Sequence, residues 1–460
     1  MRTVALHNLG CKVNAYEMDI MQDAFVNAGY KIVPFDQTAD IYVINTCSVT
    51  NIADRKSRQM LHKAKAKNPN AIVVAAGCYV NTRGKEEVLN DDVDVVVGNK
   101  EKADIADIVN NYIAEHPSVS DSADLADSED VIAVNAVESS VKTHAEIETS
   151  HTRAFVKVQD GCEMFCSYCI IPYARGQLTS RSIEDVRSEL VSLVKEGYHE
   201  FVITGIHLSS YGIDKIKFED TKGDHINFAE FIRLYHEGSM EPPLIELIEE
   251  IAKIEGVDRI RFGSLEPRII TDRFAERLAA IPEICPQFHL SLQSGSDSVL
   301  ARMNRHYTTD EFYAGAEILR KHFDNPAITT DVIVGFPGET DEEFSETVEF
   351  LKKIRFYETH VFKYSRRQGT PADKMSGQLT DAQKHARSNV LIELNAANKA
   401  AFADSFIGRE VEVLFEEGST GYTKEYVRVA STDKKYENGA IVRGKITKRL
   451  DSELMEFSDK

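Results

Sequence analysis

Three cysteines lie close together in the run Cys162-Glu-Met-Phe-Cys166-Ser-Tyr-Cys169, which we call the central triplet. Three thiolates at this CxxxCxxC spacing can bind three irons of a [4Fe–4S] cluster and leave the fourth iron without a protein ligand. An iron with an open position can bind a further molecule, so the spacing indicates chemistry rather than electron storage. Two alternatives are a zinc ion with a fourth ligand elsewhere and half of a ferredoxin site, although no fourth cysteine follows.

Three further cysteines, Cys11, Cys47 and Cys78, are far apart in the sequence, and we call them the N-terminal triplet. Each closely follows a predicted buried strand, and the carboxyl ends of parallel strands meet at one edge of a sheet. The three thiols are therefore predicted to converge, which favours a second three-thiolate cluster over the alternative of three buried structural cysteines. The seventh cysteine, Cys285, stands alone and is predicted to be non-functional.

Composition sets the broad class of the protein. The chain has 460 residues, and 54 Lys and Arg against 74 Asp and Glu give a net charge of −20. Clustered cysteines without the spacing of a disulfide framework favour metal or redox chemistry in the cytoplasm. Neither a signal peptide nor an apolar run of about 20 residues is evident, so no membrane partner is expected. The acidic balance argues mildly against a nucleic-acid partner, but local charge decides binding.

Strands and helices that position the cysteines predict an α/β protein with an all-β end. Short apolar strands alternating with helices predict first a doubly wound parallel sheet and then a partial or complete (β/α) barrel. The central triplet follows the first barrel strand, and such barrels build their active sites in the loops after strands. The predicted parts are residues 1–117 with the N-terminal triplet, an acidic linker at 118–150, the barrel at 151–380, a connecting helix at 381–405 and a small β-barrel at 406–460.

Individual strands are predicted from apolar runs bounded by turn residues. Residues 213–243 are interpreted as a polar insertion without a clear period, and a short strand is predicted at 131–134 in the linker. The other strands are predicted at residues 3–10, 40–45, 71–76, 93–97, 155–158, 201–204, 259–262, 289–292, 330–334, 359–364, 410–415, 422–430 and 441–449.

The placement of the central triplet resembles the signature of radical S-adenosylmethionine (SAM) enzymes. Together with the N-terminal triplet and a small C-terminal barrel similar to a TRAM domain, the whole chain resembles the radical SAM methylthiotransferases. The runs LGCKVN (9–14), NTCSVTN (45–51) and ADRKSRQ (53–59) are most similar to the subgroup that acts on threonylcarbamoyladenosine in tRNA. Relatives that act on isopentenyladenosine or on a ribosomal protein carry different residues around the first two cysteines.

The resemblance implies two [4Fe–4S] clusters. The central triplet would hold the cluster that binds SAM and, with an external one-electron reductant, generates a 5′-deoxyadenosyl radical. The N-terminal triplet would hold the cluster that donates the sulfur, methylated by a second SAM. The implied product is the 2-methylthio derivative of threonylcarbamoyladenosine beside the anticodon. Alternatives are the same reaction on another adenosine or a protein side chain, a non-catalytic iron–sulfur electron carrier, or a zinc-stabilised RNA-binding protein.

The resemblance also implies SAM contacts at the ends of the barrel strands. Glycine there permits close approach of the backbone to a ligand, although ordinary turn chemistry explains the glycines equally well. Tyr168, beside the last cysteine of the central triplet, is a candidate to pack near the adenine or simply in the core. The implied contacts are Thr204, Gly205, Ser264, Glu266, Gln293, Ser294 and Asp331.

Two regions are candidates for binding the tRNA anticodon loop. Arg55, Arg58, His62 and Lys65 are predicted to share one face of a helix at 51–67 that begins beside Cys47. A solvated charged face is the alternative. In the C-terminal barrel, exposed tyrosines could stack on bases and basic residues could contact phosphates. Those residues are Tyr422, Tyr426, Tyr436, Lys434, Lys435, Arg443, Lys445, Lys448 and Arg449.

Overall fold

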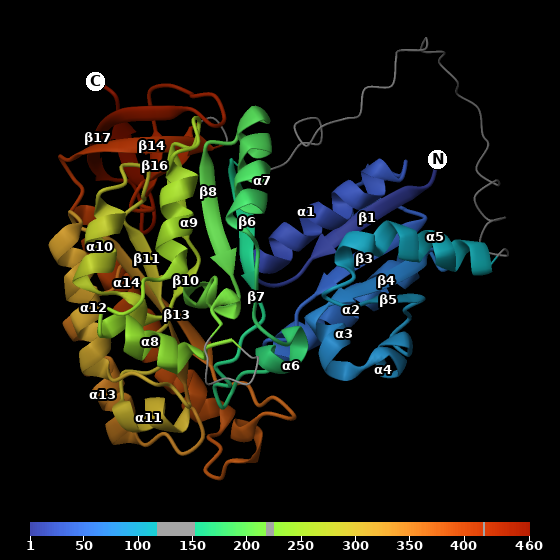
Figure 1. The fold of residues 1–460 in the computed structure, drawn as a ribbon, viewed down its shortest axis with the longest axis horizontal. Coiled ribbons are helices and arrows are strands. Elements are labelled where there is room, and N and C mark those ends of the chain that lie inside the picture. The colour runs from blue at the N-terminus through green and yellow to red at the C-terminus, as the bar shows by residue number, and fades with distance from the viewer. Residues whose placement is uncertain (117–151, 218–224, 417–418) are drawn as a thin grey trace. The chain divides into compact units, whose positions relative to one another are not determined.

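The computed structural model describes residues 1–116, 152–217, 225–416 and 419–460 (Figure 1). The chain forms two compact units, each described by itself below. The first contains Met1–Thr149 and Cys169–Gly176, and the second contains Ser150–Tyr168 and Gln177–Lys460. The predicted linker at 118–150, with its strand at 131–134, lies outside the described residues.

The first unit is built on a five-stranded parallel sheet in the order β2-β1-β3-β4-β5. Its strands are β1 (Thr3–Asn8), β2 (Lys31–Val33), β3 (Ile41–Thr46), β4 (Ile72–Gly77) and β5 (Val95–Val97). Its helices are α1 (Lys12–Asn27), α2 (Asn51–Lys67), α3 (Cys78–Arg83), α4 (Lys85–Leu89), α5 (Ile105–Glu115) and α6 (Ile171–Arg175), with a 3-10 turn at Lys102–Asp104.

Separate apolar cores cover the two faces of this sheet. Alternate residues of β3 point to opposite sides, so Val43 lies in one core and Tyr42 in the other. Strands β3 and β4 are buried along their whole length, as expected where helices cover both faces of a parallel sheet. The prediction of a doubly wound sheet is confirmed.

Helix α6 belongs to the first unit, although the sequence assigns its residues to the barrel. The reason is a buried charge network around Glu17 of α1. The Arg175 guanidinium donates to Glu17 Oε1 at 2.8 Å and to Asn14 Oδ1 at 2.8 Å. Lys102 Nζ donates to Glu17 Oε2 at 2.5 Å. A buried carboxylate between two cations therefore fastens the segment Cys169–Gly176 to α1.

The second unit contains six parallel strand positions that form an incomplete barrel with helices outside it (Figure 1). The strands are β6 (Arg153–Asp160), β7 (Thr179–Ser180), β8 (Glu200–Gly205), β9 (Arg259–Phe262), β10 (Ser264–Leu265), β11 (Gln287–Leu290), β12 (Ala327–Val334) and β13 (Glu358–Lys363). The helices are α7 (Ile183–Lys195), α8 (Phe228–His236), α9 (Pro243–Ala252), α10 (Asp272–Ala279), α11 (Asp297–Arg302), α12 (Thr309–His322), α13 (Asp341–Ile354) and α14 (Asp381–Asp404).

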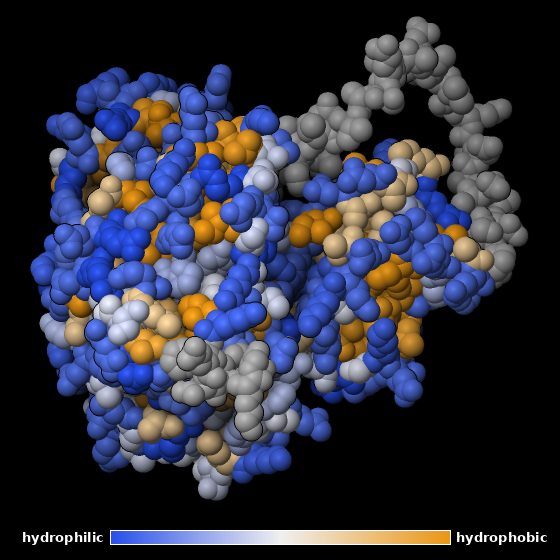
Figure 2. Space-filling model, viewed as in Figure 1, coloured by the Kyte–Doolittle hydropathy of each residue, from blue (hydrophilic) through white to orange (hydrophobic). Residues whose placement is uncertain are grey.

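The third barrel position is interrupted at Gly263, between β9 and β10, so the strands fall into two sheets. One has the order β7-β6-β8-β9 and the other β10-β11-β12-β13. The central (β/α) barrel predicted from the sequence is thus confirmed as a partial barrel. Hydrophilic residues dominate the visible face of this unit (Figure 2). Among the described helices, none is both long and apolar enough to cross a bilayer.

The interpretation of residues 213–243 as a polar segment without a period is wrong. This stretch contains α8, whose Phe228, Phe231, Ile232 and Tyr235 are buried. These positions are spaced i, i+3, i+4 and i+7, which is the pattern of one helix face. The helix has only nine residues, so its charged face dominates the local composition.

The C-terminal residues form a closed five-stranded barrel in the order β14-β15-β16-β18-β17, which confirms the predicted small β-barrel. The predicted single strand at 422–430 is wrong, because the chain turns at Tyr426, where φ is 70°. The strands are β14 (Glu410–Glu416), β15 (Thr420–Thr423), β16 (Arg428–Ser431), β17 (Ile441–Arg449) and β18 (Met455–Ser458), of which β18 was not predicted.

A buried carboxylate joins the central barrel to this C-terminal barrel. Glu200, the first residue of β8, accepts from Arg261 Nε at 2.7 Å and lies 3.1 Å from Arg153 Nε and 3.4 Å from Arg259 Nη1. Burial alone would raise the pKa of Glu200, but Arg261, Arg153 and Arg259 outweigh it and lower the pKa to about 2.

Two of these arginines, Arg259 and Arg261, also reach the backbone of the C-terminal barrel. Arg259 Nη2 donates to the carbonyl of Glu412 at 2.8 Å, and Arg261 Nη2 donates to the carbonyl of Thr423 at 2.9 Å. Glu200 therefore fixes the guanidinium groups that hold the two barrels together.

We expect Glu200→Gln to destabilise the protein by about 3–5 kcal/mol, because it leaves buried arginines without a countercharge. The midpoint of urea unfolding, followed by circular dichroism, measures this. Glu230→Gln, which removes an exposed partner of Arg233 on one helix, should leave the midpoint unchanged.

The difference in urea midpoint between Glu200→Gln and the parent protein should depend on pH. The folded pKa of Glu200 is about 2, below the unfolded value of about 4.3, so its stabilisation is complete above about pH 4.3. It is lost as the pH falls toward the folded pKa. Equal midpoints for Glu200→Gln and the parent at neutral pH would contradict this assignment.

Candidate functional site

The N-terminal triplet lies at the carboxyl edge of the first sheet. Cys11 immediately precedes α1 after β1, Cys47 follows β3, and Cys78 is the first residue of α3 after β4. These three strands are neighbours in the sheet and run parallel. The thiols come close enough for Cys11 and Cys78 to influence the ionisation of Cys47. The structure thus brings together the three cysteines that the sequence singled out.

Cys47 and Cys78 are the two buried thiols of this triplet, whereas Cys11 is exposed. Burial raises the pKa of Cys47 to about 11, and the neighbouring thiols of Cys78 and Cys11 add to the effect. Gly10 leaves room for it, because a Cβ at Gly10 would lie 3.1 Å from Cys47 Sγ. The φ of Gly10 is 117°, a region that residues with a side chain rarely adopt. A larger residue at this position would therefore displace the thiol.

Two buried asparagines hold the loops that carry Cys11 and Cys47, and the sequence analysis missed both. Asn14 Nδ2 donates to the carbonyl of Leu9 at 2.7 Å and to that of Thr46 at 3.1 Å. Asn45 Nδ2 donates to the carbonyl of Asn14 at 2.8 Å. Each asparagine stands within three residues of a cysteine, Asn14 in the first turn of α1 and Asn45 within the buried strand β3. A polar residue at these positions was a signal that the sequence offered.

Cys78 has a polar neighbour of its own. Asn99 Nδ2 lies 3.7 Å from Cys78 Sγ and donates to the carbonyl of Ala174 at 3.1 Å. This amide contacts both the N-terminal triplet and the segment that follows the central triplet, within the first unit. Asn99 was also missed, because nothing in its local sequence indicates either contact.

The central triplet begins just after β6, where Cys162 and Cys166 belong to the second unit. Cys169 begins the segment that packs with the first unit. Burial raises the pKa of Cys162 to about 11, and the Cys166 thiol adds to this. Arg305, which the sequence analysis missed, donates to Cys166 Sγ at 3.3 Å. Hydrogen bonds to the ligand sulfurs tune an iron–sulfur cluster, and Arg305 supplies one such donor.

All six cysteines of the two triplets are free thiols. Thiolates are the protein ligands of [4Fe–4S] clusters, and hydrogen bonds to sulfur tune such clusters. The donor set therefore fits the group that the sequence predicts. Cys285, by contrast, is fully buried in the second unit, and its lack of function stays a prediction.

Four predicted SAM contacts lie at or just after β8 and β10, the second and third strand positions of the barrel. Thr204 and Gly205 end β8, and a Cβ at Gly205 would lie 2.7 Å from Gln159 Oε1, so packing alone requires this glycine. Ser264 is exposed at the start of β10. Glu266 is buried and accepts from Arg268 Nε at 2.7 Å.

The remaining predicted SAM contacts lie after β11 and within β12, the fourth and fifth strand positions of the barrel. Gln293 has a φ of 73° and Ser294 Oγ lies 3.3 Å from Thr347 Oγ1. Asp331 lies within β12, beside His289. Tyr168 packs against the apolar cluster that contains Phe336, consistent with the core alternative. The roles of these residues in binding SAM stay predictions.

The basic face of α2 is partly occupied by partners within the first unit. His62 Nδ1 lies 2.7 Å from Asp92, Lys65 Nζ donates to Asp94 at 2.8 Å, and Arg58 bonds to the Tyr79 hydroxyl. Arg55 is exposed near the start of the helix, which Thr50 caps by accepting from Ala53 N. An RNA-binding role for this face stays a prediction.

The tyrosines of the C-terminal barrel stack within the protein. Tyr422 and Tyr426 stack on each other at 4.6 Å, with the Arg153 guanidinium over both rings. Tyr436 stacks on Phe415 of the barrel core at 4.1 Å. These ring faces are used by the fold, which weakens the prediction that they stack on bases.

Comparison with known proteins decides the family. The Radical SAM superfamily pattern matches residues 156–351, and that of the Uncharacterized protein family UPF0004 matches residues 3–98. The chain is 39% identical to threonylcarbamoyladenosine tRNA methylthiotransferase MtaB of Bacillus subtilis, over 97% of this chain and 94% of the relative. The chain belongs to the radical SAM methylthiotransferases.

Other relatives of this methylthiotransferase span it almost completely. MtaB of Aquifex aeolicus is 35% identical over 96% of this chain and 99% of the relative. The tRNA-2-methylthio-N(6)-dimethylallyladenosine synthase of Methylacidiphilum infernorum is 33% identical over 90% and 84%. Among solved structures, the radical SAM methyltransferase TsrM from Kitasatospora setae has a TM-score of 0.52 at 16% identity, covering 81% of this chain and 77% of TsrM, which supports the fold alone.

Family membership confirms that this methylthiotransferase is an enzyme that uses SAM and a [4Fe–4S] cluster. The CxxxCxxC spacing of the central triplet, with Arg305 beside Cys166, fits that cluster. The N-terminal triplet lies within the region matched by the second family pattern.

We expect Cys47 of the metal-free methylthiotransferase to be alkylated by iodoacetamide much more slowly than the exposed Cys11 at about pH 8. The thiolate is the reactive form, so with a pKa of about 11 the Cys47 rate should rise about tenfold per pH unit up to that value. Peptide mapping by mass spectrometry measures both rates, and equal rates at about pH 8 would contradict the enclosed geometry.

Proposed function

We propose that this chain converts threonylcarbamoyladenosine beside the anticodon of tRNA to its 2-methylthio derivative. The observation that carries this proposal is the near full-length similarity, at 39% and 35% identity, to two relatives named for that substrate. Relatives named for dimethylallyladenosine reach 33% and 31% and cover less of this chain. The three runs around Cys11, Cys47 and Arg55 support the same subgroup.

We infer that the N-terminal triplet holds a second [4Fe–4S] cluster. Its three thiols are adjacent within one unit, and Asn14 and Asn45 fix the loops that carry two of them. When bound, the two clusters and SAM supply the carbon radical and the transferred sulfur. The chain's own residues orient the thiols, keep Cys47 away from water and place a positive charge at Cys166.

The partners follow from the proposed reaction. A tRNA anticodon loop would approach the carboxyl edge of the first sheet, where Arg55 is exposed at the start of α2. An external one-electron reductant is needed, because no described side chain supplies electrons for SAM cleavage. tRNA as the substrate implies that the enzyme works in the cytoplasm.

The direct test uses the anaerobically reconstituted full chain with SAM and dithionite. Two anticodon stem-loops are compared, one carrying threonylcarbamoyladenosine and one carrying isopentenyladenosine. Nucleoside analysis by mass spectrometry should show the 2-methylthio product on the first. A product on the second alone would transfer the proposal to the other adenosine, and 5′-deoxyadenosine without either product would refute tRNA methylthiolation.

We expect Cys47→Ala to keep SAM cleavage and lose methylthiolation, because it removes one thiolate ligand of the second cluster and leaves the central triplet intact. Iron should fall from about eight to about four per chain. Iron analysis, 5′-deoxyadenosine formation and nucleoside analysis are measured on the same preparation. If the variant still modifies the stem-loop, the N-terminal triplet is not the source of sulfur.

Gly10→Ala should reproduce the iron loss without removing a ligand. Its Cβ would lie 3.1 Å from Cys47 Sγ and 3.0 Å from Asn14 Nδ2, and it would displace both groups. Gly29→Ala is the matched control, because Gly29 has a φ of 84° and open space around it. Both variants carry the backbone strain of a positive φ, so the contacts with Cys47 and Asn14 distinguish them. Similar iron contents in the two variants would contradict the role of Gly10.

A further inference from the structure

Three side chains that neither triplet uses meet on one face of the second barrel sheet. His289 is on β11, Asp331 on β12 and His360 on β13. The strand register sets them together, because His289 pairs with Thr329, two residues before Asp331, and Asp331 pairs with His360. Side chains two residues apart on a strand share a face. The opposite face carries the fully buried Leu290 and Val332.

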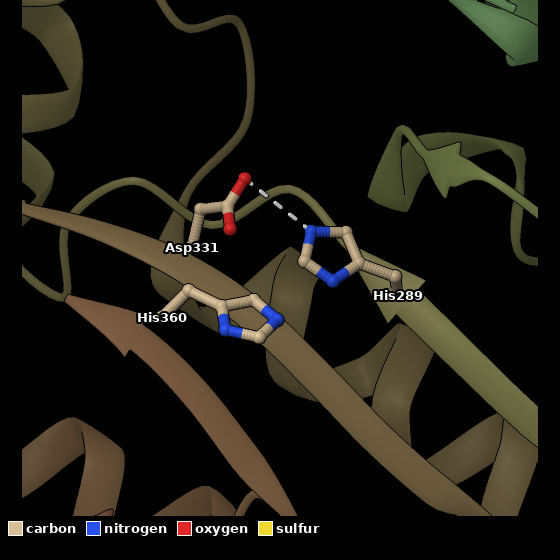
Figure 3. A group of neighbouring side chains, drawn as sticks. All are labelled: His289, Asp331 and His360. Atoms are coloured by element: carbon tan, nitrogen blue, oxygen red, sulfur yellow. Dashed lines mark ion pairs between the residues drawn. The ribbon is translucent and has the colours of Figure 1, made fainter. Parts of the chain in front are cut away.

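The three side chains point toward a common space (Figure 3). One potential ligand atom from each residue lies within 4.8 Å of the other two. His289 Nε2 and Asp331 Oδ2 are 3.4 Å apart. Two ligands bound about 2.1 Å from one tetrahedral ion are separated by about 3.4 Å, so this pair already has the spacing of two ligands of one metal.

The second ring nitrogen of His289 has its own partner. Nδ1 lies 3.0 Å from Thr329 Oγ1, which also accepts from Gln287 Nε2 at 3.4 Å. Metal-binding histidines commonly use their other nitrogen in this way, which fixes the ring and leaves a lone pair for the ion. Nε2 then faces the Asp331 carboxylate at a distance well beyond the 2.7–2.9 Å of a charged hydrogen bond. Two electron-rich groups held at that distance favour a cation between them.

We propose that His289, Asp331 and His360 bind one divalent transition-metal ion of the Zn²⁺ type. Two imidazoles and one carboxylate match the ligand preference of Zn²⁺, Fe²⁺ and Mn²⁺ and not that of Ca²⁺ or Mg²⁺. Three protein ligands leave a position open for water or a substrate oxygen, as in catalytic rather than structural zinc sites. This metal site is separate from the two cysteine triplets, because neither triplet contributes a ligand to it.

The test uses the full chain with its clusters in place and Mn²⁺ alone as the probe. Thiolates bind Mn²⁺ poorly, whereas imidazole and carboxylate bind it, so the cysteines do not compete. Electron paramagnetic resonance at room temperature measures free Mn²⁺ during a titration. We expect one saturable site per chain, displacement of the bound Mn²⁺ by Zn²⁺, and coupling of the bound Mn²⁺ to imidazole nitrogen in pulsed spectra.

The main variant is His360→Gln, because His360 is exposed, lies on the last strand of its sheet and is not a predicted SAM contact. It should weaken Mn²⁺ binding at least tenfold, and Asp331→Asn should do the same. His199→Gln is the matched control, because His199 lies 2.9 Å from Asp258 in a similar pair that, among the described residues, has no third potential ligand grouped with it. Iron content and circular dichroism verify the fold of each variant.

Three outcomes overturn the proposal. The first is the absence of saturable Mn²⁺ binding to the parent chain. The second is a site that His360→Gln leaves intact, and the third is bound Mn²⁺ that shows no nitrogen coupling. The nitrogen coupling is read on the unaltered protein, so it decides the question even where a variant fails to fold.

Discussion

The parallel direction of neighbouring strands is the constraint on which the functional sites depend. Because all strands of a parallel sheet end at the same edge, the loops after β1, β3 and β4 bring Cys11, Cys47 and Cys78 together from distant positions. The same rule places the central triplet after β6 and the predicted SAM contacts on the barrel strands or in the loops that follow them. The cysteines of the N-terminal triplet lie directly after the strands or in the short loops that follow them. Where these segments pack closely together, the chain has glycine or asparagine, as at Gly10 and Asn14.

Buried ion networks add the connections that parallel strands cannot make. Glu17 holds Lys102 and Arg175 and so attaches the segment after the central triplet to the first unit. Glu200 holds Arg259 and Arg261, which donate to the backbone of the C-terminal barrel, and Arg153, which donates to the side chains of that barrel. Desolvation makes such networks poor sources of net stability, yet an unmatched buried charge is costly. An arrangement that separated these partners would leave buried charges unmatched, so the networks act against such alternatives.

Particular elements show where prediction from the sequence succeeds. Helix α2 and strand β17 have the predicted bounds, because long periodic runs with clear caps or turns define them locally. Helix α8 escaped prediction because its four buried residues lie among charged ones in only nine positions. The turn between β15 and β16 escaped because Tyr426, and not glycine or asparagine, adopts the positive φ.

The sequence by itself determined the donor atoms and the class of chemistry, because six cysteines at these spacings and strand ends have few alternative uses. Only the tertiary structure decided which of the predicted SAM-binding and RNA-binding side chains already have partners within the protein. Glu266 binds Arg268, His62 and Lys65 bind aspartates, and Tyr436 stacks on Phe415. Only strand register could bring His289, Asp331 and His360 together. The physical reason is that residue type and local period are properties of the chain itself. Proximity between residues 29 and 42 positions apart, as for Asp331 with His360 and His289 with Asp331, arises only when the sheet forms.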